Sequence, residues 1–86
     1  MSRQHHYLGI LPQYYRAIEQ GKKTFEVREK RDRNFQEYDI LHLLEELGGE
    51  RSGREIIAEV TYVLDDPRFC KEGFVVMGIR VETINN

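Results

Sequence analysis

The stretch PQYYRAIEQGKKTFEVR, residues 12–28, contains the change of pattern that decides the fold. Its first half places apolar residues at helical spacing on one stripe. These residues are Leu11, Tyr14 or Tyr15, and Ile18. Pro12 suits the first position of a helix, where its missing N–H costs nothing, and Gly21 suits the C-terminal cap. We therefore predict a helix of about two to three turns that depends on packing for its stability.

The second half of the stretch changes to a period of two, which is typical of a strand. In TFEVR, Phe25 and Val27 alternate with the polar residues Thr24, Glu26 and Arg28. We predict a strand that buries the two apolar side chains. The three polar side chains are then expected to line up on the opposite face.

The rest of the chain predicts four more strands around this helix and strand. They are residues 7–11, 39–44, 54–64 and 74–84. Polar or glycine-containing segments at 30–38, 45–53 and 65–73 are expected to be loops or turns. The long strands should each bury one face, formed by Ile56, Ala58, Val60 and Tyr62 and by Val75, Met77, Ile79 and Val81. Five strands and one or two short helices predict a mainly β (α+β) fold, a small and partly closed β-barrel, because closure protects sheet edges.

Length and composition indicate one globular domain over residues 1–86, because so short a chain supports only one core. Hydrophobic residues make up 40% and charged residues 33%, which argues against a disordered chain or a membrane protein. No apolar run approaches the roughly 20 residues that span a bilayer, and the N-terminus does not resemble a signal peptide. The single cysteine, Cys70, cannot form an internal disulfide. We expect a cytoplasmic protein without a membrane partner.

The charge distribution is uneven, although the formal net charge is only −2. Residues 22–33 contain six basic and three acidic residues, a net +3 that leaves −5 for the remainder. The basic residues are Lys22, Lys23, Arg28, Lys30, Arg31 and Arg33. Such a patch on an acidic body can guide a phosphate-bearing ligand to one place. A solvated basic loop is the alternative interpretation.

The strongest candidate site combines Lys23 with the strand residues Thr24, Glu26 and Arg28. An ammonium, a hydroxyl, a carboxylate and a guanidinium supply donors and acceptors suited to phosphate, ribose and base edges. Polar alternation is also what any half-exposed strand shows. Both interpretations stay open from spacing alone.

Four blocks in order, ILPQYYRAIEQGKKTFEVRE, RDRNFQEYDIL, SGREIIAEVTYVLDD and GFVVMGIR, cover nearly the entire chain. Together they resemble a small stand-alone, bacterial-type member of the ASCH domain family, whose fold is related to the PUA domains of RNA-modifying enzymes. GKKTFEVR is similar to the characteristic motif of that family. The resemblance implies a PUA-like β-barrel with a cleft beside this motif and a role in RNA binding, often linked to translation or RNA processing.

Some ASCH proteins hydrolyse the amide of acetylcytidine with a motif lysine, a threonine on the next strand and a later glutamate. Lys23 matches the lysine, whereas Glu26 stands at the position of the threonine, and no glutamate of this sequence matches the third residue. Lys23 and Glu26 are therefore the catalytic candidates of the alternative function, a small amidohydrolase acting on an acetylated nucleoside. A lysine becomes a nucleophile when burial lowers its pKa, and a carboxylate can take its proton.

Residues beyond the motif could extend the binding surface. Arg31 and Arg33 lie in the loop after the strand, and Arg54 opens a later strand as a weaker candidate for the same cleft. Phe35 and Tyr38 could stack on a base, although Phe35 could equally plug the barrel end. The resemblance also places Tyr38 where relatives commonly have glycine.

No metal or cofactor site is expected. His5 and His6 are adjacent and should point to opposite faces of a strand, and His42 should be packed or half exposed. Cys70 has no CxxC partner, and the sequence has no glycine loop of the kind that cradles ATP or NAD.

The sequence thus predicts an RNA- or nucleotide-binding module. Its expected contact residues are Lys22, Lys23, Thr24, Glu26, Arg28, Arg31, Arg33 and Arg54. The alternatives are the amidohydrolase and a protein-interaction domain whose acidic remainder docks a partner. The oligomeric state is left open by the sequence.

Overall fold

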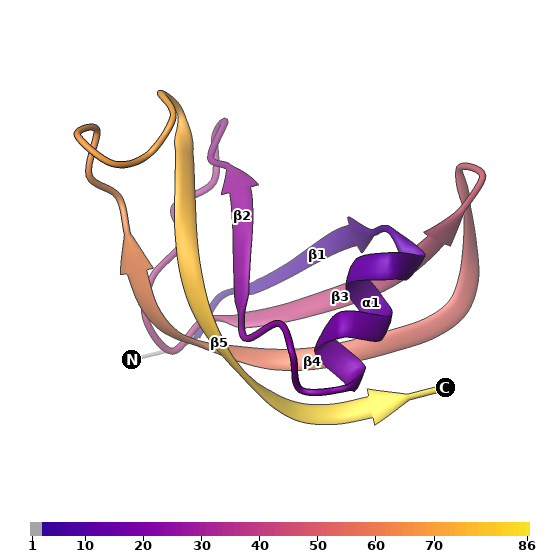
Figure 1. Ribbon diagram of the computed structural model, residues 1–86. Helices are drawn as coiled ribbons and strands as arrows, with labels where there is room; N and C mark the ends of the chain where they lie inside the picture. The colour runs from indigo at the N-terminus through magenta and orange to yellow at the C-terminus, as the bar shows by residue number, and fades with distance from the viewer. Residues whose placement is uncertain (1–2) are drawn as a thin grey trace.

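A computed structural model describes residues 3–86 as one curled sheet with a single helix. The elements are β1 (His5–Ile10), α1 (Pro12–Glu19), β2 (Phe25–Glu29), β3 (Ile40–Leu47), β4 (Glu50–Leu64) and β5 (Phe74–Asn85). The five strands follow the order β1-β3-β4-β5-β2. β1 is parallel to β3, and the other neighbouring pairs are antiparallel. Figure 1 shows the sheet curving round α1 as a half-barrel.

The predicted mainly β architecture is confirmed, with five strands and one short helix in the predicted order. β1 and β2 are the two edges of the sheet and are not paired with each other within residues 3–86. The half-barrel is thus compatible with the small, partly closed barrel expected from the sequence.

Helix α1 begins and ends as its sequence predicts. Pro12 occupies its first turn, and Gly21 follows its end with a positive φ of 77°. Gly21 N donates to Ile18 O and Lys22 N donates to Ala17 O, both at 2.9 Å, which is the hydrogen-bond pattern of a Schellman C-cap. This cap fixes the backbone at Lys22 and therefore the point from which the basic segment leaves the helix.

The prediction of a turn over residues 45–53 was too long. Only Gly48 and Gly49 connect β3 to β4, with positive φ values of 58° and 85° that favour a tight two-residue hairpin turn. The polar residues on either side belong to the strands, which extend beyond the body of the sheet. Composition alone suggested a loop because glycine and charge are frequent there.

One hydrophobic cluster fills the concave side of the sheet and the inner face of α1. Tyr15 and Ile18 of the helix are buried, whereas Leu11 and Tyr14 are exposed. Ile56, Ala58 and Val60 face the core as predicted, but Tyr62 is 60% exposed. A register shift between Val60 and Tyr62 explains this difference, because an extra residue in one strand reverses the faces that follow it. On β5, Val75, Met77 and Ile79 are buried and Val81 is 37% exposed.

The predicted faces of β2 were wrong. Glu26 is only 2% exposed, whereas Phe25 and Val27 are 45% and 51% exposed. A buried carboxylate is tolerated when it is paired, and two cations meet Glu26 on the inner side. The strand therefore turns its polar face inward, opposite to the orientation that hydrophobicity predicted.

The loop after β2 is held against the start of β1. His6 is buried and its Nε2 lies 2.9 Å from Asp39 Oδ2, while the ring of Phe35 lies 4.6 Å from the His6 ring. Phe35 is therefore a buried packing residue, as one of the two expectations had it. Tyr38 adopts a positive φ of 75°, a backbone conformation that glycine adopts most readily. Within residues 3–86, no helix is both long enough and apolar enough to cross a membrane.

Candidate functional site

A cleft of ≈ 640 Å³ lies between the two edge strands of the half-barrel. Residues 9–11 at the end of β1 form one wall and residues 25–28 of β2 form the other. Tyr14 and Ala17 of α1, together with Lys22 and Lys23 after its cap, complete the lining. The cleft is thus built largely from the stretch that decides the fold.

Lys23, Glu26 and Arg28 meet in this cleft and are called the triad below. Lys23 Nζ contacts Glu26 Oε1 and also donates to Phe25 O at 2.7 Å. Arg28 reaches Glu26 Oε2 through Nε at 2.8 Å and through a terminal nitrogen at 2.7 Å. Both carboxylate oxygens are therefore occupied by cationic donors. One anion between two cations leaves the triad with a net charge of +1.

The cations of the triad remain accessible, whereas the carboxylate does not. The Lys23 and Arg28 side chains are 15% and 22% exposed, against 3% for the Glu26 side chain. A ligand in the cleft therefore meets the two cationic side chains and not the carboxylate. Glu26 holds those side chains in place and limits their freedom to move.

Two half-exposed aromatic rings stand beside the triad. Lys23 Nζ lies 5.0 Å from the centre of the Phe25 ring and 5.8 Å from the centre of the Tyr14 ring. These distances suit cation–π attraction. Both rings line the cleft and keep about half of their surface open. They provide apolar faces on which a planar ligand can stack.

The unpaired edge of β2 adds backbone groups to the cleft. Ile79 N donates to Thr24 O at 3.0 Å, so the Thr24 carbonyl faces β5. Because carbonyls alternate in direction along a strand, those of Phe25 and Val27 face the opposite way. Lys23 caps the Phe25 carbonyl. The N–H and C=O of Val27 therefore face the cleft without a neighbouring strand in residues 3–86.

Several predicted contact residues lie outside this cleft. Thr24 is exposed and directs its carbonyl to β5, away from the lining. Arg31 is 80% exposed at its side chain and pairs with Glu29 at 2.9 Å. Arg33 lines a separate depression. The predicted basic patch is thus divided among different surroundings.

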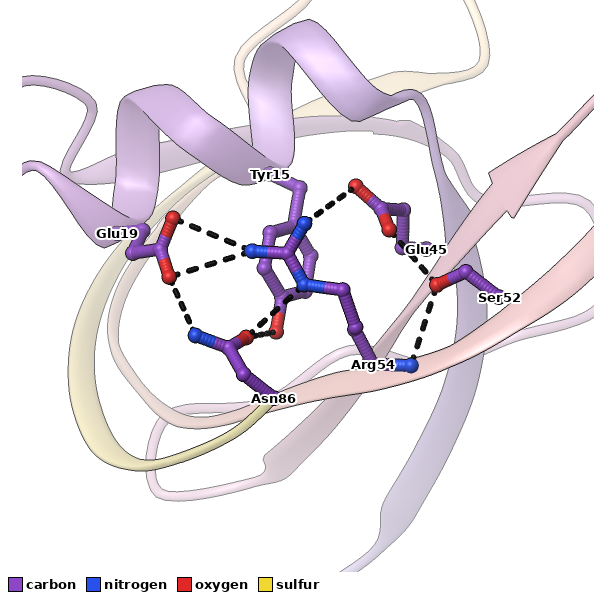
Figure 2. A network of polar contacts seen from close by, with 6 residues as sticks. All are labelled: Tyr15, Glu19, Glu45, Ser52, Arg54 and Asn86. Carbon is purple, nitrogen blue, oxygen red and sulfur yellow. Dashed lines mark hydrogen bonds and ion pairs between the residues drawn. The ribbon is translucent and has the colours of Figure 1, made fainter.

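Arg54 belongs to a network on another side of α1, shown in Figure 2. Its terminal nitrogens lie 3.3 Å from Glu19 and 3.5 Å from Glu45, and its Nε donates to Asn86 Oδ1 at 3.1 Å. The guanidinium also covers the Tyr15 ring, 4.7 Å from its centre. We call these five residues, with Ser52, the Arg54 network. Arg54 does not line the cleft, so its expected place there was wrong.

The Arg54 network connects α1 to three strands. Glu19 and Tyr15 come from the helix, Glu45 from β3, Arg54 from β4, and Asn86 follows β5. Burial raises the pKa of the Tyr15 hydroxyl above its ordinary value of 10.0, and nearby Arg54 opposes that rise. The network is a structural connection that fixes the helix forming part of the cleft.

The residues that sequence reasoning missed are mainly apolar. Tyr14 was considered only as a core candidate, and Leu11 was assigned to the buried stripe, yet both line the cleft. The neighbouring tyrosines 14 and 15 were the available signal. On a helix two adjacent residues point about 100° apart, so only one can face the core fully.

The histidines lie on the faces of the sheet that their pattern predicted. His5 is exposed and His6 buried, on opposite faces of β1. His42 is half buried, with its Nδ1 2.8 Å from Glu55 and its Nε2 2.8 Å from His5 Nδ1. Among residues 3–86, no group of three or more histidine, cysteine or acidic residues could hold a metal ion.

Comparison with protein families gives one match. Residues 5–79 match the family described as "Domain of unknown function (DUF3850)". The chain belongs to the DUF3850 family. The matched part of this DUF3850 domain includes the whole lining of the cleft, from residue 9 to residue 28. Among curated proteins, none matches the chain.

Proposed function

We propose that this DUF3850 domain is an RNA-binding module of the PUA-like, ASCH type that holds one nucleotide unit in the cleft and acts in cytoplasmic RNA metabolism or translation. The observation that carries the proposal is the convergence of Lys23, Glu26 and Arg28 on one cleft beside two half-exposed aromatic rings. The blocks of sequence that resemble the ASCH family include this motif.

The charges of the cleft favour a ligand rich in hydrogen-bond acceptors. Lys22 lines the cleft without an acidic partner in residues 3–86, so it adds to the +1 of the triad. Phosphate oxygens and base carbonyls are acceptors of the kind that lysine and arginine bind. Glu26 already accepts from two cations, and we assign it a positioning role in place of direct contact with a base.

The shape of the cleft favours a planar group. Its volume of ≈ 640 Å³ is within the ordinary range for sites that enclose a small ligand. Tyr14 and Phe25 offer ring faces for base stacking, which contributes about 1–3 kcal/mol per base. The Val27 peptide group can pair with the edge of a base that carries a donor next to an acceptor.

The test is a binding titration with single-stranded RNA at several salt concentrations. Lys23→Ala and Arg28→Ala should each weaken binding about tenfold and reduce the salt dependence, because each phosphate contact releases counterions. Arg68→Ala is the matched control, since Arg68 is 78% exposed, pairs with Asp66 and lies outside the cleft. Equal affinities for the two cleft variants and the wild type would contradict the proposal.

A second candidate is hydrolysis of an acetylated nucleoside, favoured by the contact between Lys23 and Glu26 within a cleft. In that reaction water adds to the acetyl carbonyl, the amide C–N bond breaks, and acetate and the protonated or free amine leave. Lys23 Nζ is engaged by Glu26 and by Phe25 O, and Glu26 also accepts from Arg28, so a catalytic role would require these contacts to be exchanged for contacts with a substrate. Binding is therefore the function that the geometry favours.

Incubation with acetylcytidine distinguishes the two candidates. The binding proposal predicts no acetate release above a control without protein. Acetate release that disappears in Lys23→Ala would establish the hydrolase instead.

A further inference from the structure

We propose that the RNA strand continues from the cleft to a second depression, where Arg33 receives a phosphate that neighbours the bound nucleotide. This inference rests on the proposed function and adds the course of the strand to it. The depression has a volume of ≈ 560 Å³. It is lined by Gln4, His5, His6, Asp32, Arg33 and Asn34.

Both hollows are lined by β1 on one side and by β2 or the loop that follows it on the other. β1 contributes Gly9 and Ile10 to the cleft and His5 and His6 to the depression. On the other side, residues 25–28 of β2 line the cleft and residues 32–34 of the following loop line the depression. Along each of the two lining segments, neighbouring residues therefore line first the cleft and then the depression.

The separation of the hollows suits a chain and not a single small ligand. Gly9 lies three residue steps beyond His6, which corresponds to roughly 10 Å along β1. A nucleotide held by its base in the cleft leaves its backbone free to continue toward the depression. A neighbouring phosphate can then lie over the depression.

Arg33 has the chemistry for that phosphate. The other basic residues of the loop are paired, Lys30 with Asp65 at 3.0 Å and Arg31 with Glu29. Arg33 has no ion pair with any residue in 3–86, so its guanidinium is available for the bidentate contact that arginine makes with phosphate. Asp32 also lines the depression, and its opposite charge weakens the attraction of Arg33 for a phosphate.

Asn34 can support the same contact. Its Oδ1 accepts a hydrogen bond from Gln36 Nε2 at 2.8 Å, which leaves the amide N–H₂ group as the free part of the side chain. The depression therefore offers an amide donor next to a guanidinium.

The depression is held in shape by buried contacts. Asp39 Oδ2 meets His6 Nε2 and accepts from Gln36 N at 3.0 Å, while its Oδ1 accepts from Gln4 N at 3.3 Å. The Phe35 ring packs on the His6 ring from the loop side. These contacts join the loop to β1, so a ligand need not order the loop before binding.

The experiment compares short and long probes on three proteins. Affinities for AMP, CMP and UMP, and for the single-stranded hexamers of A, C and U, are measured against salt concentration. The proteins are the wild type, Arg33→Gln and Arg31→Gln. Arg31→Gln is the matched control because it removes the same charge from the same loop outside both hollows.

We expect the hexamers to bind the wild type more tightly than the monophosphates do. Arg33→Gln should weaken hexamer binding about three- to tenfold, lower its salt slope by about 0.7, and leave monophosphate binding unchanged. Arg31→Gln should behave as the wild type. Hexamers that bind no better than monophosphates, or Arg33→Gln equal to Arg31→Gln on hexamers, would overturn the strand path while leaving the cleft proposal standing. Failure of every probe to bind the wild type would overturn both.

Discussion

The triad and the Arg54 network have opposite arrangements of charge. In the triad a carboxylate, Glu26, lies between two cations, and in the network a guanidinium, Arg54, lies between two carboxylates. The triad belongs to the segment from the end of α1 to β2, and the Arg54 network contacts α1 through Tyr15 and Glu19. The triad lines the ≈ 640 Å³ cleft, and Arg54 does not.

The difference shows how similar ion pairs can serve different purposes. The buried carboxylate of the triad positions two cations whose outer surfaces remain open to a ligand. The Arg54 guanidinium instead donates hydrogen bonds to Glu19, Glu45 and Asn86, which belong to separate parts of the fold. In the proposed function the triad provides recognition, and the Arg54 network fixes the helix that forms part of the cleft.

The largest effect is expected from Glu26→Gln. This change leaves Lys23 and Arg28 without their shared counter-charge in a mostly buried position, and breaking such a buried ion pair costs about 3 kcal/mol or more. The free energy of unfolding, measured by urea denaturation, should fall by about that amount. A loss below about 1 kcal/mol would show that the triad is solvated and not a buried unit.

A smaller effect is expected from Arg54→Met, which replaces the guanidinium that covers the Tyr15 ring with an uncharged, unbranched side chain. Because Arg54 is partly exposed, the loss should be about 1–2 kcal/mol of unfolding free energy. The salt slope of RNA binding should stay as in the wild type, measured in the same titration as the cleft variants. A reduced salt slope of RNA binding, with the helix content unchanged, would indicate direct contact between Arg54 and RNA. It would contradict the different roles given to the triad and the Arg54 network.

The smallest effect is a pH dependence of the unfolding free energy that comes from Tyr15 in the Arg54 network. Burial raises the pKa of Tyr15 in the folded chain, so the unfolded chain loses that proton at lower pH. The resulting stability is fully present below about pH 10, the ordinary tyrosine pKa, and is lost as pH rises through the folded pKa. The difference between the ultraviolet titration curves of the wild type and Tyr15→Phe gives the titration of Tyr15 alone. A Tyr15 pKa at or below the ordinary value would contradict the burial of its hydroxyl in the network.

The order and type of the elements could be predicted because local chemistry determines them. Pro12 and Gly21 mark the ends of α1, and the change of period after Thr24 marks β2. The faces of β2 could not be predicted in the same way. Alternation separates two faces but does not say which one is buried, and the ion pairs of Glu26 with its sequence neighbours Lys23 and Arg28 stabilise the face that hydrophobicity alone places outside.

The site was predictable in part for the same reason. Glu26 and Arg28 are two positions apart and therefore share one face of β2, and Lys23 lies just before that strand. Arg54 was assigned to the wrong side because its partner Glu19 is 35 positions away and no local pattern connects them. Tyr62 was placed in the core because a register shift in a strand leaves no clear mark in the sequence.

The most direct test of the central claim is an NMR titration of isotope-labelled protein with the RNA hexamers, following backbone amides and arginine Nε–H groups. The account predicts the largest shifts at Lys22, Lys23, Val27 and Arg28, with Arg54 Nε–H unchanged. Shifts centred on Arg54 and Asn86, or no shifts at the cleft, would contradict it.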